Sequence, residues 1–148
     1  MARMLAGTSV RIRRGVRRDA GRVLELLGRR AGGAGERRCR RQLADRSGDI
    51  YVAEEPGGRL VAVVAIAYAR SIVRDGWAAV LDGVRQDAQA AEPLLDPLIA
   101  LAEERARRRG CQRVLAWVDP TDAPLRAALE ARAYRGRELL VAELGGRA

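Results

Sequence analysis

The sequence predicts an α/β domain built on one mixed sheet of six or seven strands with about four helices, in the order β-α-α-β-β-β-α-β-α-β. Three observations lead to this prediction. The chain has 148 residues, 48 % of them hydrophobic and 32 % charged, which suits a single domain over residues 1–148 with a full core. Residues 49–84 contain three strand patterns in succession. The second half places a long amphipathic helix between two strand patterns, as in a β-α-β unit.

The N-terminal part predicts one strand and two helices. Residues 10–13 alternate apolar and charged side chains, which is typical of a half-buried strand. Asp19 is placed to cap a helix whose apolar face lies between positions 23 and 27. The glycine-rich stretch 32–35 ends this helix, and a short, very basic helix is expected over residues 36–45.

The central part predicts a hairpin followed by a third strand. Residues 49–54 and 60–69 are strand patterns, and the Pro-Gly-Gly sequence at 56–58 supplies the turn between them. Residues 61–66 are apolar on both faces, which favours a central strand covered on both sides. Residues 77–84 form the next strand candidate.

The C-terminal part predicts the β-α-β unit and two closing elements. A helix is expected over residues 93–109, with leucines at helical spacing, and Gly110 ends it. A buried strand follows over 113–118, and its parallel neighbour is expected to be the strand ending near residue 84. Asp122 is placed to cap a helix reaching residue 133, and residues 138–144 are expected to form a last strand.

The composition excludes several kinds of chemistry. The chain has no histidine, so Ser-His-Asp and Cys-His nucleophilic catalysis are excluded. Cys39 and Cys111 are expected to be free thiols, and two thiolates alone cannot complete a tetrahedral zinc site. No apolar stretch approaches the roughly 20 residues that span a bilayer, and no secretory signal is recognisable, so we expect a cytoplasmic protein without a membrane partner.

The net charge of +9 raises the question of a nucleic-acid partner. All 28 basic residues are arginines, which indicates a bias spread over the whole chain. The segment from Arg29 to Arg41 is the most concentrated, and it is interpreted as a solvated surface or a lip for an acidic ligand. A nucleic-acid patch is the disfavoured alternative.

The order of elements from Val10 to Leu144 resembles the GNAT family of N-acetyltransferases. The most specific segment runs from the Leu94-Leu95 pair, which opens the long helix, through Arg109-Gly110 at its end, to the strand ending at Val118. The resemblance implies a mixed sheet in which the two parallel strands splay apart. It also implies acetyl-CoA as co-substrate, with its pantetheine arm in that splay.

The acetyl-CoA loop of the family corresponds to residues 86–91. Gln86 and Ala91 match the Gln/Arg-x-x-Gly-x-Gly/Ala motif, but Gln89 stands where the central glycine belongs, so the motif is degenerate. In this family, backbone N–H groups at a helix N-terminus cradle the pyrophosphate. The resemblance therefore implies a cofactor site, assisted by one arginine, made of Gly83, Val84, Arg85, Gln86, Gln89, Ala90 and Ala91. Asp87 and the acids at the helix start would oppose an anion.

The catalytic residues implied by the resemblance are incomplete. Leu129 occupies the position of the family's general-acid tyrosine, and Tyr134 occupies an aromatic packing position. Asp82 is the best-placed general base, with Asp75 and Asp119 as weaker candidates. A strand amide near Gly83 or Val84 would stabilise the oxyanion.

Three functions remain open from the sequence. The first is acetyl transfer from acetyl-CoA to an amine of a small molecule, a protein N-terminus or a side chain, by direct attack. The second is a GNAT-like module that has lost catalysis and serves in binding or homodimer formation. The third is a small basic nucleic-acid-binding protein.

Overall fold

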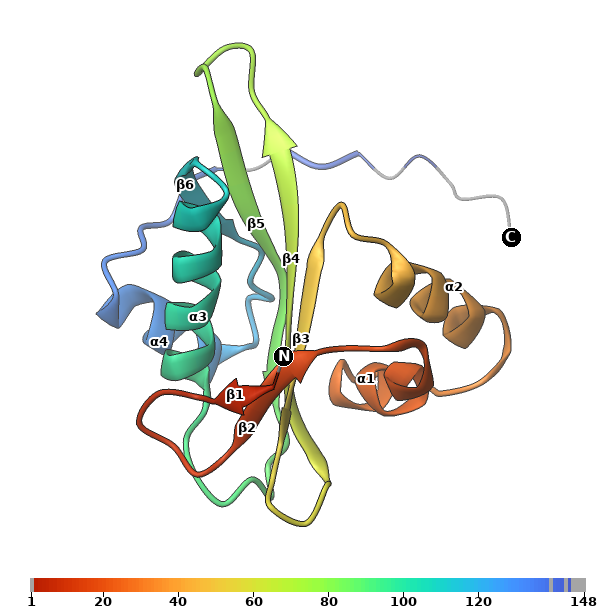
Figure 1. Cartoon of the computed structure of the whole chain (residues 1–148). Coiled ribbons are helices and arrows are strands. Elements are labelled where there is room, and N and C mark those ends of the chain that lie inside the picture. The colour runs from red at the N-terminus through yellow and green to blue at the C-terminus, as the bar shows by residue number, and fades with distance from the viewer. Residues whose placement is uncertain (1, 139, 143, 145–148) are drawn as a thin grey trace.

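The computed structural model describes residues 2–138, 140–142 and 144 of the chain. Figure 1 shows a central sheet with helices on both sides. Its elements are β1 (Arg3–Met4), β2 (Arg11–Arg14), the 3-10 helix η1 (Arg17–Asp19), α1 (Ala20–Leu26), α2 (Gly33–Ala44), β3 (Asp49–Glu54), β4 (Leu60–Arg70), β5 (Trp77–Gln86), α3 (Leu95–Arg108), β6 (Cys111–Ala116) and α4 (Ala123–Ala131). No helix in the described part of the chain is long and apolar enough to cross a membrane.

The strands of the sheet lie side by side in sequence order, from β1 to β6. Neighbours from β1 to β5 are antiparallel, and β5 and β6 are parallel. The mixed sheet, the β3–β4 hairpin and the parallel pair were predicted from the sequence and are confirmed. The strand over 49–54 has the predicted bounds, because its alternating pattern ends at a strong turn signal.

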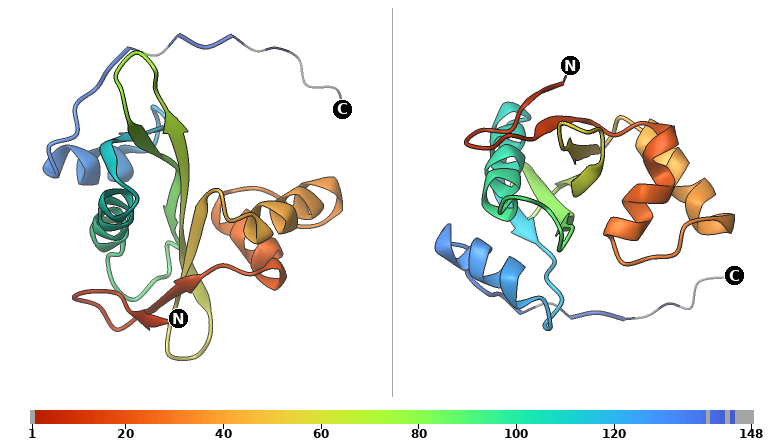
Figure 2. Two further views of the ribbon diagram at one scale, coloured as in Figure 1. Left: turned by 45° about the horizontal axis from the view of Figure 1, so that its top comes forward. Right: turned by 90° about the horizontal axis from the view of Figure 1, so that it is seen from below.

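Two helical layers cover the sheet (Figure 2). On one face, α3 packs Leu98, Ile99 and Ala102 against β4 and β5, and α4 lies beside it. On the other face, α1 and α2 bury a second, smaller cluster that includes Val23, Cys39 and residues of β3 and β4. The apolar run in β4 is therefore buried on both faces, as its sequence predicts.

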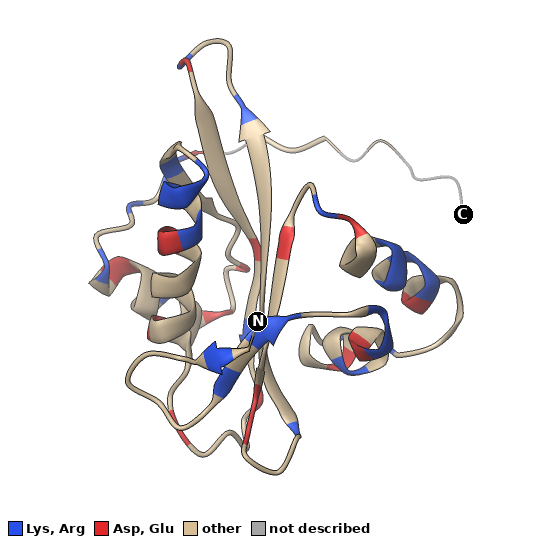
Figure 3. Ribbon diagram, in the orientation of Figure 1, with Lys and Arg blue, Asp and Glu red and all other residues tan. Residues whose placement is uncertain are grey.

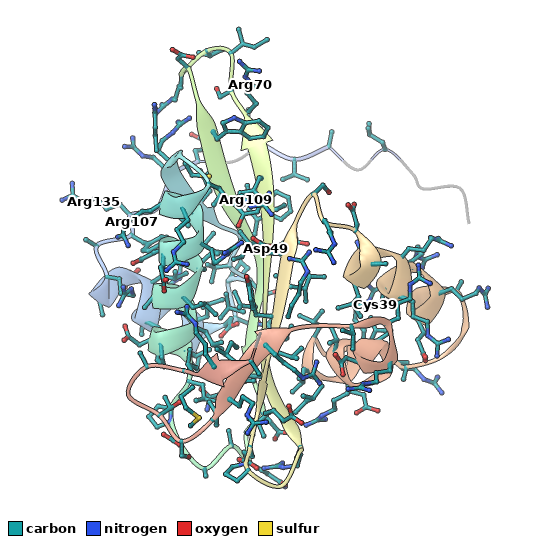
Figure 4. The ribbon with its side chains drawn as sticks, in the orientation of Figure 1. Cys39, Asp49, Arg70, Arg107, Arg109 and Arg135 are labelled. Atoms are coloured by element: carbon teal, nitrogen blue, oxygen red, sulfur yellow. The ribbon has the colours of Figure 1, made fainter. Side chains whose placement is uncertain are left out.

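The C-terminal end of α3 is joined to the sheet by ion pairs in addition to apolar contacts. Asp49, the first residue of β3, is fully buried. Its carboxylate accepts hydrogen bonds from Arg14 (2.5 Å), Tyr68 Oη (2.6 Å), Arg109 (3.4 Å) and Arg105 (3.5 Å). The Arg109 guanidinium also lies 4.4 Å from the centre of the Tyr68 ring. We call this group the Asp49 network; Figure 4 shows Asp49 and Arg109 next to each other.

Several local predictions were wrong. Asp19 does not cap α1: its carboxylate binds Arg13 (2.7 and 3.0 Å) and accepts the Val16 N–H (2.8 Å). The glycine-rich stretch does not separate the two helices, because α2 already begins at Gly33, after the left-handed Gly32. The short edge strand β1 was not predicted, since two residues carry no periodic pattern.

The prediction of a last strand over residues 138–144 also differs from the structure. Residues 138, 140–142 and 144 do not form a strand, and positions 139 and 143 lie outside the described residues. Leu140, Val141 and Leu144 are exposed, so these apolar side chains are not packed against the sheet.

The basic segment from Arg29 to Arg41 runs from the end of α1 along α2 (Figure 3). Most of its arginines are exposed, and Arg40 pairs with Glu36 one turn earlier (2.7 Å). The structure thus places this charge on a helix surface; its partner stays a prediction.

Candidate functional site

The parallel strands β5 and β6 separate partway along their length. Their pairing runs from Trp77–Cys111 to Leu81–Ala116, and the Trp117 N–H donates a last hydrogen bond to the Leu81 carbonyl (3.2 Å). Beyond Leu81, β5 continues to Gln86, paired among the described strands only with β4. A hollow of about 650 Å³, which we call the splay cavity, opens here. Residues 84–86 line one side, and residues 119, 121, 122 and 124 line the other.

A β-bulge lies where the strands separate. Gly83 pairs with Ala65 and Leu81 pairs with Ile66, so Asp82 is an additional residue on β5. The bulge keeps Leu81 and Val84 in the same core cluster under α3, although they are three residues apart. Asp82 lies at a second pocket of about 320 Å³ between α1, α2 and the sheet, which we call the helix-side pocket.

Gly83 follows the bulge and approaches α1. A Cβ at this position would lie 3.0 Å from Leu27 Cδ2, so a larger side chain would require the Leu27 side chain to move. Leu24 of α1 and Leu27, which directly follows the helix, form part of the helix-side pocket beside Asp82. One strand segment, residues 82–86, therefore runs past both cavities.

The loop between β5 and α3, residues 87–94, has several backbone amides that are hydrogen-bonded within the protein. Five of its N–H groups have acceptors within the protein. Two donate to backbone carbonyls: Asp87 to Val61 (2.7 Å) and Ala90 to Asp87 (3.0 Å). Three donate to side chains: Gln89 to Asp87 Oδ1 (2.8 Å), Ala91 to Glu55 Oε1 (3.3 Å) and Leu94 to Gln86 Oε1 (2.7 Å). Pro93 and Pro97 have no N–H to offer. Few amides at the start of α3 are left for an outside anion.

Asp87 itself takes the place that an anion would occupy in such a loop. Its carboxylate accepts the Gln89 N–H, is bonded to the Arg22 guanidinium, and lies 3.7 Å from Arg59. The Gln89 N–H and the Arg22 guanidinium hold the pKa of Asp87 below its ordinary value. Arg59 also binds Glu55 (3.0 Å) and the Gln89 carbonyl (3.2 Å). The loop is therefore closed by two internal carboxylates and two arginines.

The side chains of Arg85 and Gln86 also form bonds within the protein. Arg85 reaches across the splay cavity to bond with Asp122, the N-cap of α4, whose Oδ1 accepts the Leu125 N–H (3.2 Å) as predicted. Gln86 caps the start of α3: besides accepting the Leu94 N–H, its Nε2 donates to the Glu92 carbonyl (3.2 Å). Gln86 matches the family motif, and here it stabilises the loop.

Solved structures that share this architecture include acetyltransferases and a transcriptional regulator. A transcriptional regulator from Bacillus halodurans C-125 has a TM-score of 0.80 and 20 % identity, over 91 % of this chain and 99 % of that chain. Ribosomal-protein-alanine N-acetyltransferase from Brucella melitensis biovar Abortus 2308 has a TM-score of 0.75 and 19 % identity, over 92 % and 99 %. The chain has the GNAT fold.

Glucosamine-6-phosphate N-acetyltransferase from Arabidopsis thaliana has the same GNAT fold, with a TM-score of 0.73 and 17 % identity, over 92 % of this chain and 98 % of that chain. No family model and no curated protein sequence matches the chain. The likeness therefore lies in the GNAT fold and not in the sequence.

The GNAT fold brings the predicted site residues together at one strand end. Asp82 faces the helix-side pocket, residues 83–86 follow it along the splay, and Gln89, Ala90 and Ala91 lie in the closed loop. Asp119 binds Thr121 (2.6 and 2.8 Å), and these hydrogen bonds lower the pKa of its carboxyl. Asp75 lies in the exposed turn between β4 and β5. Asp82 is thus the only one of the three candidate bases that lines the helix-side pocket.

Other predictions concern α4 and its end. Leu129 is buried in the core under α4, so no hydroxyl stands at the family's general-acid position. Tyr134 packs against the same core, as predicted. Sequence reasoning missed Glu55, Arg22 and Arg59, because they are 30 to 65 residues away from the loop residues that they bind and carry no local signal.

Proposed function

We propose that the protein is an acyl-CoA-dependent N-acetyltransferase. One observation carries this proposal: residues 82–86 of β5 border a cavity on each side, and the strand lacks a β6 partner at that point among the described residues. The splay cavity suits a narrow acyl-pantetheine arm, and the helix-side pocket suits a small amine. An acyl group at the bulge would then lie within reach of both.

The residues of the bulge suit direct attack by an amine. Acetyl-CoA supplies an activated thioester; the new C–N bond forms as the C–S bond breaks. Asp82 would accept the proton of the amine, because it is the carboxylate at the helix-side pocket next to the strand. A backbone N–H near Gly83 would donate to the thioester oxygen. The departing thiolate takes its proton from water, since Leu129 offers none.

The loop supports only weak cofactor binding. A pyrophosphate needs free amides in the loop and at the start of α3, and three of these amides, those of Gln89, Ala91 and Leu94, are bonded to Asp87, Glu55 and Gln86. Binding must therefore displace an internal carboxylate, and we expect a dissociation constant in the range of about 0.1–1 mM.

Calorimetry with acetyl-CoA tests the proposal. Asp87→Asn keeps an oxygen for the Gln89 N–H but removes the negative charge, so we expect binding to tighten about tenfold, equal to roughly 1.4 kcal/mol. Gln89→Gly should also tighten it, because the backbone can then approach a phosphate more closely. Asp75→Asn, in the exposed β4–β5 turn, is the control and should change nothing. Submicromolar binding by the unaltered protein would contradict the closed-loop interpretation.

A second function, a GNAT-like binding module without catalysis, is favoured by the same closed loop. If neither the unaltered protein nor Asp87→Asn binds acetyl-CoA at about 10 mM, the acetyltransferase proposal fails and the module is preferred. If acetyl-CoA binds but no free CoA thiol appears with a panel of amines and N-terminal peptides, the module is again preferred.

A further inference from the structure

A second polar cavity lies away from the proposed active site. It has a volume of about 460 Å³ and is formed by the C-terminal part of α3, the first residues of β6 and the segment after α4. The splay opens beyond the other end of β6, after Ala116, so the two cavities border opposite ends of that strand. Figure 4 shows Arg107 and Arg135 on this side of the molecule. We call it the arginine cavity.

The lining of the arginine cavity carries a surplus of positive charge. Five arginines line it, against one acid, Glu103. Glu103 is already held by Arg132 (2.7 and 3.1 Å) and lies 3.8 Å from Arg107. Within the described residues, no carboxylate lies within 4.0 Å of the other three, which are Arg113, Arg135 and Arg137. Like charges gathered at one hollow repel each other, and a bound anion would relieve that repulsion.

The rest of the lining suits a ligand with an apolar body. Ala106, Cys111 and Val114 supply apolar surface, and Tyr134 contributes its ring. The Tyr134 hydroxyl is buried and makes no hydrogen bond of good geometry among the described residues, although burial and the nearby Glu103 carboxylate raise its pKa. A buried donor without a well-placed acceptor is costly, and an anionic oxygen in the cavity would accept a hydrogen bond from this hydroxyl.

A turn at the end of α4 positions the tyrosine and arginines of the cavity. Ala133 has a positive φ of 65°, and the Tyr134 N–H returns to the Leu129 carbonyl (3.1 Å), which closes the end of α4. The turn leads directly into Tyr134, Arg135 and Arg137, so their place beside α3 follows from the end of α4.

We propose that the arginine cavity binds a small organic dianion, a phosphate monoester or a dicarboxylate with an apolar or aromatic body. Two or more guanidinium groups would bind the anionic oxygens, the Tyr134 hydroxyl would donate a further hydrogen bond, and the apolar side chains would contact the body of the ligand. This proposal is independent of the acetyltransferase proposal, because the two cavities share no lining residue.

Calorimetry with phenyl phosphate and with phthalate tests the site and distinguishes the two sources of negative charge. At least one of them should bind, and benzyl alcohol, which has no charge, should not. The double variant Arg135→Ala/Arg137→Ala should weaken binding tenfold or more. The double variant Arg37→Ala/Arg38→Ala on α2 removes the same charge elsewhere and should change affinity less than twofold. Tyr134→Phe removes only the hydroxyl and should weaken binding several-fold.

Alkylation of the two cysteines tests where the ligand binds. Cys111 lines the arginine cavity, whereas Cys39 is buried under α2 on the other face of the sheet. The bound dianion should slow alkylation of Cys111, measured by peptide mass spectrometry, and leave the rate at Cys39 unchanged. Burial raises the pKa of both thiols, so the reaction is best followed near pH 9.

Three results would overturn the proposal. The first is no binding of either dianion at about 10 mM. The second is equal weakening by the two double variants, which would indicate a general charge effect. The third is a labelled RNA that binds more tightly than either dianion and depends on Arg135 and Arg137, which would make this face a nucleic-acid site.

Discussion

Replacing Asp49 by asparagine should destabilise the protein more than any other single removal of an acid charge. Asparagine keeps the volume and one acceptor oxygen, so the change removes mainly the charge that three guanidinium groups share. Removing one partner of a buried ion pair typically costs about 3–5 kcal/mol. Here the side chains of Arg14, Arg105 and Arg109 are 30 %, 28 % and 35 % exposed, so water can hydrate them after the change. We therefore expect a loss of about 2–4 kcal/mol.

The assay is urea and thermal unfolding followed by circular dichroism. For a chain of this length, the expected loss corresponds to a decrease in Tm of about 5–15 °C. Asp45→Asn is the matched control, because Asp45 is exposed and, within the described part of the chain, its side chain is hydrogen-bonded only to the nearby Ser47. A loss for Asp49→Asn below about 1 kcal/mol, or one equal to that of the control, would refute the view that the network holds α3 to the sheet.

The pH dependence gives an independent check. Burial alone would raise the pKa of Asp49, but the hydrogen bonds of Tyr68 and Arg14 and the charges of Arg105 and Arg109 outweigh it and lower the pKa. Stability from a lowered pKa is present above the unfolded value of about 3.9 and is lost as the pH falls through the folded value. The stability gap between the unaltered protein and Asp49→Asn should therefore shrink below about pH 4, and a constant gap would contradict this explanation.

Three further predictions follow from other parts of the fold. Ala133→Gly should stabilise the protein by about 1 kcal/mol, raising Tm by about 2–4 °C, because Ala133 has a φ of 65°; an unchanged or lower Tm would show that the turn is not strained. Asp82→Asn should lower the rate of acetyl transfer about 10²–10⁴-fold with cofactor affinity unchanged, whereas a loss of affinity alone would assign Asp82 to binding. RNA binding through the segment from Arg29 to Arg41, measured by anisotropy, should vanish near 150 mM salt; submicromolar binding there, abolished by neutralising Arg37, Arg38, Arg40 and Arg41, would favour a nucleic-acid function.

The sequence predicted what depends on local periodicity. The hairpin, the central strand and the helix after Pro93 were found because apolar spacing and turn residues are read within a few positions. The degenerate loop was also recognised, from Gln89 in place of glycine. Its consequence was understood only in part, since Asp87 was expected to repel an anion and in fact replaces one within the loop.

Long-range polar partners could not be predicted. Asp49 has the sequence context of an acid at the end of a turn, and only the fold surrounds it with Arg14, Arg105 and Arg109, 35 to 60 residues away. Glu55 is a second case, since it meets Ala91 only because the β3–β4 hairpin and the loop lie at the same end of the sheet. The type of a side chain and its local sequence do not show which distant residues it will contact in the fold.

The bulge at Asp82 divides β5 into a clamped part and a released part. Residues 77–81 are held on both edges, by β4 and β6, whereas residues 83–86 are held among the described strands only by β4. The clamped part fixes the bulge against the core, so Asp82 stands on a rigid support. The released part has one strand edge free of β6, while Val84 stays in the core and Gln86 holds the start of α3. Substitutions on the two sides of Asp82 should thus act separately, on folding before it and on ligand choice after it.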